Sequence, residues 1–228
     1  MSTSLASVPT VTAFQWVPPF AQGVVRDLRV RWAMEEAGLP YGQRLIGPPD
    51  QTTADYRRLQ PFGQVPVYQE PAAEGGLALF ESGAIVLHIA EQSSALMPTD
   101  PAARARAVSW IFAALNSVEP PISNLAEIDL FNADAAWAKE RRPEVVEQVR
   151  KKLANLADWL GDREHLEGPF TAGDLMMVTV LRNLRHTELV AETPSLKAYQ
   201  QRGEARPAFQ KALAAQLAAF EGNAPPGA

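Results

Sequence analysis

The position of the strand-forming patterns is the feature that most constrains the fold of this chain. A small number of short segments alternate apolar and polar residues as β-strands do, and all of them lie before residue 95 of the 228: 10–16, 41–46, 65–70 and 77–82. After Pro101 the apolar residues recur only at helical spacing. A chain of this length has room for two ordinary domains. The sequence therefore predicts a small mixed α/β domain followed by an all-helical domain.

The order of elements in the first part predicts a thioredoxin-like domain over residues 8–95. Helical spacing over 24–37, stopped by Gly38, separates the first two strands, and such a crossover makes these strands parallel. A Gly-containing turn between the last two strands predicts an antiparallel hairpin, and a helix follows from Ser82 to about Gln92.

The second part predicts a helical domain over residues 100–220. One helix is expected from Pro101 to about Asn116, with Pro120 and Pro121 ending or kinking it, and another from Pro143 to Leu160. The segment Thr171–Asp174 predicts a capping box ahead of a central, nearly all-apolar helix. A Pro/Gly-rich tail, 221–228, is expected to be disordered.

Composition excludes several classes of function. The net charge of −5 argues against nucleic acid as a partner, and the basic runs 26–31 and 141–152 are predicted to be polar helix faces. The absence of cysteine excludes disulfides and a protein thiol nucleophile, and the three scattered histidines predict no metal site. No apolar stretch is long enough for a membrane span, and the segment MSTSLASVPT has no basic residues ahead of a hydrophobic run, so we expect a cytoplasmic protein.

Two short segments carry specific chemical signals. In Gln60-Pro61-Phe62-Gly63-Gln64-Val65-Pro66, a proline heads a strand, and a cis Val65-Pro66 bond would turn the backbone N–H and C=O of Val65 outward to pair with an extended peptide. A trans bond is the commoner alternative for an isolated X-Pro pair. At Glu81-Ser82 a strand ends and a helix starts, so Ser82 and the amides after it form an anion site suited to an α-carboxylate, with Glu81 placed to meet an ammonium group. Ordinary capping is the alternative role of Ser82.

Together, these segments resemble those of the glutathione transferase family, and the resemblance covers nearly the whole chain. The segment 60–66 is similar to the family's cis-proline segment, Glu81-Ser82 to its γ-glutamyl recognition pair, and 171–174 to the cap of its buried helix. The resemblance implies a thioredoxin-like domain, a helical C-terminal domain, a homodimer, and glutathione as cosubstrate. It also implies a set of glutathione-binding residues: Gln51, Thr53, Gln64, Val65, Pro66, Glu81 and Ser82.

The chain departs from the family at the turn after the first strand. Members place a Tyr, Ser or Cys there, whereas no Ser, Thr, Tyr or Cys occurs between Thr12 and Tyr41. We expect Arg26, and after it Gln22, to stabilise the glutathione thiolate instead, because positive charge and hydrogen-bond donors lower a thiol pKa. A solvated helix face is the alternative role of Arg26. The resemblance suggests an acceptor pocket lined by Trp16, Trp110 and Phe112.

These observations favour an enzyme that activates glutathione for attack on a small hydrophobic electrophile. Two alternatives stay open: a glutathione-dependent disulfide or peroxide reductase, and a non-catalytic glutathione-binding or protein-interaction module of the same fold. A thioredoxin-like exchanger would need a cysteine in the turn. An α/β-hydrolase would need a glycine two residues before Ser82.

Overall fold

A computed structural model describes residues 8–71 and 76–225 of the chain. The described residues up to Ser94, together with those from Pro207 on, form one compact unit, and residues 95–206 form another. The predicted domain boundaries, 8–95 and 100–220, stay a prediction, and so does the disordered tail at 221–228, part of which (226–228) lies outside the described residues.

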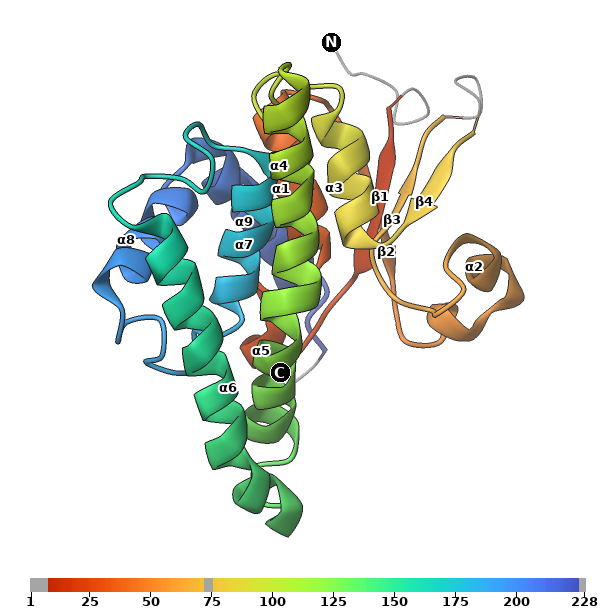
Figure 1. Ribbon diagram of the computed structural model, residues 1–228. Coiled ribbons are helices and arrows are strands. Elements are labelled where there is room, and N and C mark those ends of the chain that lie inside the picture. Colours follow the sequence, from red (N-terminus) through yellow and green to blue (C-terminus); the bar gives the residue numbers. More distant parts are fainter. Residues whose placement is uncertain (1–7, 72–75, 226–228) are drawn as a thin grey trace. The chain divides into compact units, whose positions relative to one another are not determined.

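The described part of the first unit contains a four-stranded sheet in the order β2-β1-β3-β4 (Figure 1). The strands are β1 (Thr10–Phe14), β2 (Gly42–Ile46), β3 (Val67–Gln69) and β4 (Ala78–Phe80). β1 is parallel to β2 and antiparallel to β3, and β3 is antiparallel to β4. This topology confirms the predicted thioredoxin-like arrangement, with strands one to three residues shorter than expected.

Helices α3 (Ser82–Ala90) and α2 (Ala54–Leu59) lie on opposite sides of the strands in Figure 1. Helix α1 (Asp27–Ala37) packs against α3 and ends at Gly38, whose φ of 67° is the left-handed conformation that glycine adopts without steric cost. Short 3₁₀ turns, η2 (Pro19–Ala21) and η3 (Asp50–Thr52), follow β1 and β2.

The last helix, α9 (Pro207–Glu221), packs along α1 in the same unit. The rings of Trp32 and Phe209 meet edge to face with centroids 4.9 Å apart, and both side chains are buried. Farther along, the Lys211 ammonium lies 2.7 Å from the Glu35 carboxylate. An aromatic contact and an ion pair thus join α9 to α1 at two positions along the helix.

The second unit is helical throughout its regular elements, as predicted. In chain order these are α4 (Pro101–Phe112), the π-helical η5 (Ala113–Val118), α5 (Glu119–Ala126), the π-helical η6 (Glu127–Phe131), α6 (Ala136–Leu160), α7 (Ala172–Arg182) and α8 (Pro194–Glu204).

The prolines mark where the helices of this unit differ from the expected bounds. The helical path does not end at Pro120 and Pro121. The wide π turn of η5 precedes the two prolines. Both lie in the first turn of α5, where a missing backbone N–H costs little. Helix α6 begins before Pro143 and includes it, at the cost of one backbone hydrogen bond.

Helix α7 is buried along nearly its whole length and begins with the predicted capping box. The Thr171 hydroxyl accepts from the helix backbone, and the Asp174 carboxylate accepts from the Thr171 N–H at 2.9 Å. Gly173 allows α4 to approach, since a Cβ there would lie 2.6 Å from the Cβ of Trp110. Within the described residues, no helix is long and apolar enough to cross a bilayer.

Candidate functional site

The sheet topology brings the predicted binding segments to one edge of the sheet. β1 and β2 both end there, at the paired residues Phe14 and Ile46. Val67, which begins β3, pairs with both Thr12 and Phe80, so β3 starts and β4 ends at the same edge. The chain segments that leave or enter the sheet at this edge carry most of the predicted site residues: Trp16, Gln22, Arg26, Gln51, Thr53, Gln64, Val65, Pro66, Glu81 and Ser82.

The segment 60–66 has the backbone conformation expected of a peptide-pairing edge. The Val65-Pro66 peptide bond is cis, as predicted, and both residues are buried. Just before it, the hydroxyl of the buried Tyr56 donates to the Gln64 carbonyl at 2.6 Å. Burial raises the pKa of Tyr56 to about 12, so this hydroxyl stays protonated and keeps donating.

Two further side chains hold the preceding backbone carbonyls. The Gln51 amide donates to the Gly63 carbonyl at 2.6 Å, and the Arg57 guanidinium donates to the Pro61 carbonyl at 2.8 Å. Gly63 has a φ of 65°, and a Cβ there would lie 2.7 Å from the Arg57 guanidinium carbon. Glycine is therefore required here both by the turn and by the close approach of Arg57.

Glu81 has an unusual backbone conformation. Its φ of 69° makes it the one non-glycine residue with positive φ among those described. Such conformations cost of the order of 1–3 kcal/mol and are concentrated at functional sites. Glu81 is exposed and occupies the N-cap position of α3, so its carboxylate is presented to solvent beside the start of the helix.

Ser82 begins α3, and its side chain is buried rather than solvated. The Arg29 guanidinium donates to the Ser82 hydroxyl oxygen at 3.2 Å. Since that oxygen accepts from Arg29, the hydroxyl hydrogen can be donated elsewhere, toward a carboxylate at the start of α3. The arrangement offers an anion a donor, an arginine charge and the positive end of a helix.

The burial of Arg29 corrects the prediction that residues 26–31 form a polar helix face. Arg29 and Arg31 are 3% and 1% exposed. Burial is possible because each guanidinium has polar partners inside the fold: Ser82 for Arg29, and the Asp27 carboxylate, 2.7 Å away, for Arg31. Arg26 alone of the three is exposed, at the N-cap position of α1.

The other predicted residues of this unit lie as follows. Thr53 caps α2: its hydroxyl donates to the Asp50 carbonyl at 2.8 Å and accepts from the Tyr56 N–H at 3.3 Å. The Gln22 amide donates to the Val17 carbonyl at 3.1 Å, which braces the β1–α1 turn (residues 15–26). Trp16 is half-buried in the same turn.

Sequence reasoning missed the residue that reaches the β1–α1 turn from α9. The Gln216 amide oxygen accepts from the Gly23 N–H at 3.1 Å, and its nitrogen donates to the Val25 carbonyl at 3.2 Å and to the Asp27 carboxylate at 2.7 Å. Burial raises the pKa of Asp27, and Arg31 and Gln216 oppose that rise. Because these contacts join residues about 190 positions apart, no local sequence pattern could indicate them.

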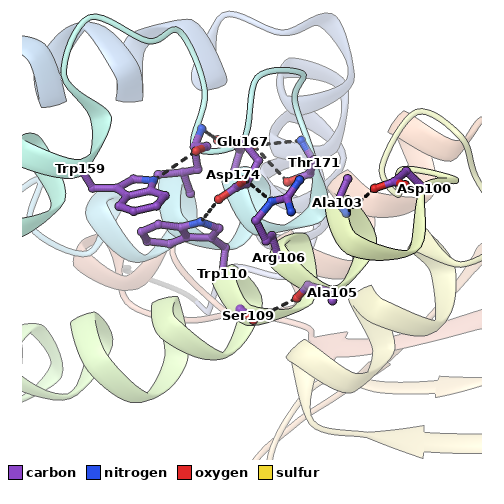
Figure 2. A network of polar contacts seen from close by, with 11 residues as sticks. Asp100, Ala103, Ala105, Arg106, Ser109, Trp110, Trp159, Glu167, Thr171 and Asp174 are labelled. Atoms are coloured by element: carbon purple, nitrogen blue, oxygen red, sulfur yellow. Dashed lines mark hydrogen bonds and ion pairs between the residues drawn. The ribbon is translucent and has the colours of Figure 1, made fainter.

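Trp110 and Phe112 lie on α4 in the second unit. The Trp110 indole N–H and the Arg106 guanidinium each donate to the Glu167 carboxylate at 2.9 Å. Figure 2 shows both side chains directed at Glu167. The Trp159 ring lies beside Trp110 with centroids 5.4 Å apart. Phe112 is exposed. Trp110 is thus held in place by the second unit's own residues.

Nothing in the described part of the chain gathers three or more His, Asp or Glu side chains into a group that could hold a metal ion.

Residues 28–92 match the family described as the glutathione S-transferase N-terminal domain. Glutathione S-transferase 3 of Zea mays is 31% identical over 215 residues, covering 86% of this chain and 91% of that protein. The Escherichia coli disulfide-bond oxidoreductase YfcG is 28% identical over 195 residues, covering 79% of this chain and 86% of that protein.

Among solved structures, a glutathione transferase family member from Pseudomonas fluorescens, crystallised with two glutathione molecules bound, is similar to this chain with a TM-score of 0.81. The two are 25% identical, and the likeness covers 92% of this chain and 94% of that one.

Proposed function

This chain belongs to the glutathione transferase family, and we propose that it binds glutathione at the sheet edge of its first unit and activates the thiol for attack on a small hydrophobic electrophile. The observation that carries the proposal is the convergence, at one edge, of the cis Val65-Pro66 segment and the buried Ser82 at the start of α3. An extended peptide with a carboxylate at one end matches both features.

At the γ-glutamyl end, the α-carboxylate accepts from the Ser82 hydroxyl and the first amides of α3, and Glu81 meets the α-ammonium group. Arg29 adds positive charge through its contact with Ser82. Along the middle of the ligand, the cysteinyl backbone pairs with Val65, which Pro66 holds at the head of β3.

At the glycyl end, Gln51, Thr53 and Gln64 complete the proposed binding set. Gln51 and Thr53 already make hydrogen bonds within the fold, and an amide nitrogen has a second hydrogen to offer. The Gln64 side chain is exposed beside Val65.

The thiol end is the chemical centre of the proposal. A free thiol has a pKa of about 8.5, and lowering it by two units requires about 2.7 kcal/mol in favour of the thiolate. Arg26 supplies the charge, Gln22 a donor, and the N-terminus of α1 a favourable dipole. The thiol proton passes to solvent, the sulfur forms a bond to the electrophilic carbon, and the leaving group departs with its electron pair.

Trp16, in the β1–α1 turn, is proposed to contribute to the acceptor pocket. The roles expected for Trp110 and Phe112 stay predictions. The homodimer implied by the family resemblance and the cytoplasmic location expected from the sequence remain parts of the same proposal.

Glutathione-dependent disulfide reduction is the second candidate, supported by the likeness to a protein named as a disulfide-bond oxidoreductase. The chain has no cysteine, so two glutathione molecules must supply the electrons. The first thiolate attacks the disulfide and releases one thiol; the second attacks the mixed disulfide, releasing the other thiol and glutathione disulfide.

Calorimetric titration with glutathione, followed by assays with chlorodinitrobenzene and with a glutathione mixed disulfide, tests these functions. Conjugation of the aromatic halide supports the transferase, whereas turnover of the disulfide alone favours the reductase. Binding without either turnover would support the non-catalytic glutathione-binding module. Absence of binding would contradict every glutathione-dependent function and leave the protein-interaction module.

A further inference from the structure

The β1–α1 turn (residues 15–26) is held by a residue from the far end of the chain. Gln216 is 1% exposed, and every polar group of its side-chain amide has a partner in the first unit. The oxygen accepts from the Gly23 N–H, and the nitrogen donates once to the Val25 carbonyl and once to the Asp27 carboxylate. We call these three hydrogen bonds the Gln216 clamp.

Only a primary amide of this length satisfies the clamp. The turn presents one donor and two acceptors, so the side chain must offer one acceptor and two donors from a single planar group. An ionised Glu at position 216 would have no donor, and a Met would have neither function. Arg31 also holds the Asp27 carboxylate in place, because its guanidinium lies 2.7 Å from the second Asp27 oxygen. The same guanidinium donates to the Gln43 side chain on β2.

The clamp acts on the turn in which the family places its catalytic side chain and this chain has none. It commits the Gly23 N–H to Gln216, and the Val24 N–H donates to the Ala21 carbonyl, so these two amides hold the turn rather than a ligand. Gly23 has a φ of 78°, which the clamp stabilises. Arg26 follows directly, between two clamped residues, Val25 and Asp27.

We propose that Gln216 is a positioning residue for thiol activation: its amide holds the β1–α1 turn in the conformation that directs Arg26 at the glutathione sulfur. The inference rests on the proposed function, since it needs a glutathione thiolate at this turn. Gln216 itself contacts no ligand. Helix α9 therefore has a role in the chemistry beyond covering α1.

The test compares Gln216→Met, and the milder Gln216→Asn in case the first does not fold, with Tyr199→Phe. The control removes a buried hydrogen bond of similar size, between the Tyr199 hydroxyl and Asp174 in the second unit. Hydrogen exchange of the turn is measured without ligand. The pKa of the bound glutathione thiol, from its ultraviolet thiolate absorbance, and the glutathione affinity are measured by titration.

We expect the Gln216 variants to speed exchange at residues 22–27 and to raise the thiol pKa by about one unit, a tenfold smaller thiolate fraction at neutral pH. Affinity should change by less than about threefold, because the γ-glutamyl and cysteinyl contacts lie elsewhere and distant sites act independently. Tyr199→Phe should lower stability and leave the thiol pKa unchanged.

A thiol pKa that stays at its wild-type value while exchange of the turn rises would overturn the positioning role and leave a structural clamp. Unchanged exchange would overturn the clamp itself. If the wild-type protein binds glutathione without any shift of the thiol pKa, the positioning role is overturned although glutathione binding stands. If it does not bind glutathione, the proposed function fails first, and the inference with it.

Discussion

The two ends of the proposed glutathione site are built by different means. At the γ-glutamyl end, Ser82 and Glu81 are proposed to contact the ligand directly, and the buried Arg29 donates to the Ser82 hydroxyl oxygen. The thiol end has no hydroxyl or thiol group between Thr12 and Tyr41 and consists of a turn held by Gln216. Glutathione binding and thiol activation should therefore be separable. Substitutions at the γ-glutamyl end should lower glutathione affinity, and substitutions at the thiol end should reduce ionisation of the bound thiol.

The largest effect is expected from Ser82→Ala. Loss of a hydrogen bond to a charged carboxylate costs about 1.5–3 kcal/mol, so glutathione affinity should fall about 10-fold to 100-fold. The pKa of whatever thiol remains bound should not move. Calorimetry at saturating protein provides the measurement, and Ser109→Ala, which removes an exposed hydroxyl that bonds only within α4, is the matched control. A thiol pKa that rose along with the Kd would show that the two ends are coupled.

Tyr56→Phe tests the support of the Val65 segment. It removes the hydrogen bond to the Gln64 carbonyl, so we expect about 1 kcal/mol lower stability and a few-fold weaker glutathione binding. Chemical denaturation and calorimetry give both values. Tyr199→Phe should match the loss of stability without the loss of affinity; equal affinity losses in the two variants would contradict a role for Tyr56 in the site.

Two substitutions of Glu81 separate the energetic cost of its backbone conformation from the contribution of its side chain to glutathione binding. Glu81→Ala should weaken glutathione binding and give no gain in stability, because a positive φ is also unfavourable for alanine. Glu81→Gly should weaken binding similarly and raise stability by up to about 1 kcal/mol. Equal stability of the two variants, measured by denaturation, would argue against strain at this position.

The smallest effect concerns pH. The pKa of Tyr56 is raised to about 12 by burial, against 10.0 for the free side chain. Between these values the folded state holds a proton that the unfolded state has lost, so the stability of the wild type should fall as pH rises from 10.0 toward 12, relative to Tyr56→Phe. A stability difference that stays constant over this range would contradict the burial of the hydroxyl.

Local patterns predicted the architecture and one end of the site. Alternation in 10–16 and 65–70, the proline in Val65-Pro66, and a serine where a strand gives way to a helix all depend on neighbouring residues. The Val65-Pro66 bond is cis, as the family resemblance implied. Ser82, expected as the cap of the helix, is its first residue instead, and Glu81 occupies the N-cap position.

What the sequence could not predict depends on distant contacts. Arg29 was expected on a polar face because its neighbours are charged, and only the packing of α1 on α3 reveals Ser82 as its partner. Gln216 has no local signal, since its three partners all come from residues 23–27. The helix through Pro143 likewise depends on packing of the residues on either side, which outweighs the cost of one proline.

The β1–α1 turn is proposed to lower the pKa of a bound glutathione thiol without a hydroxyl or thiol group of its own. The direct measurement follows thiolate absorbance of saturating protein with glutathione as pH is varied, in the wild type and in Arg26→Ala. We predict a thiol pKa well below its free value of about 8.5 in the wild type and a return toward that value in the variant. Bound glutathione with an unshifted thiol pKa in the wild type would contradict the account.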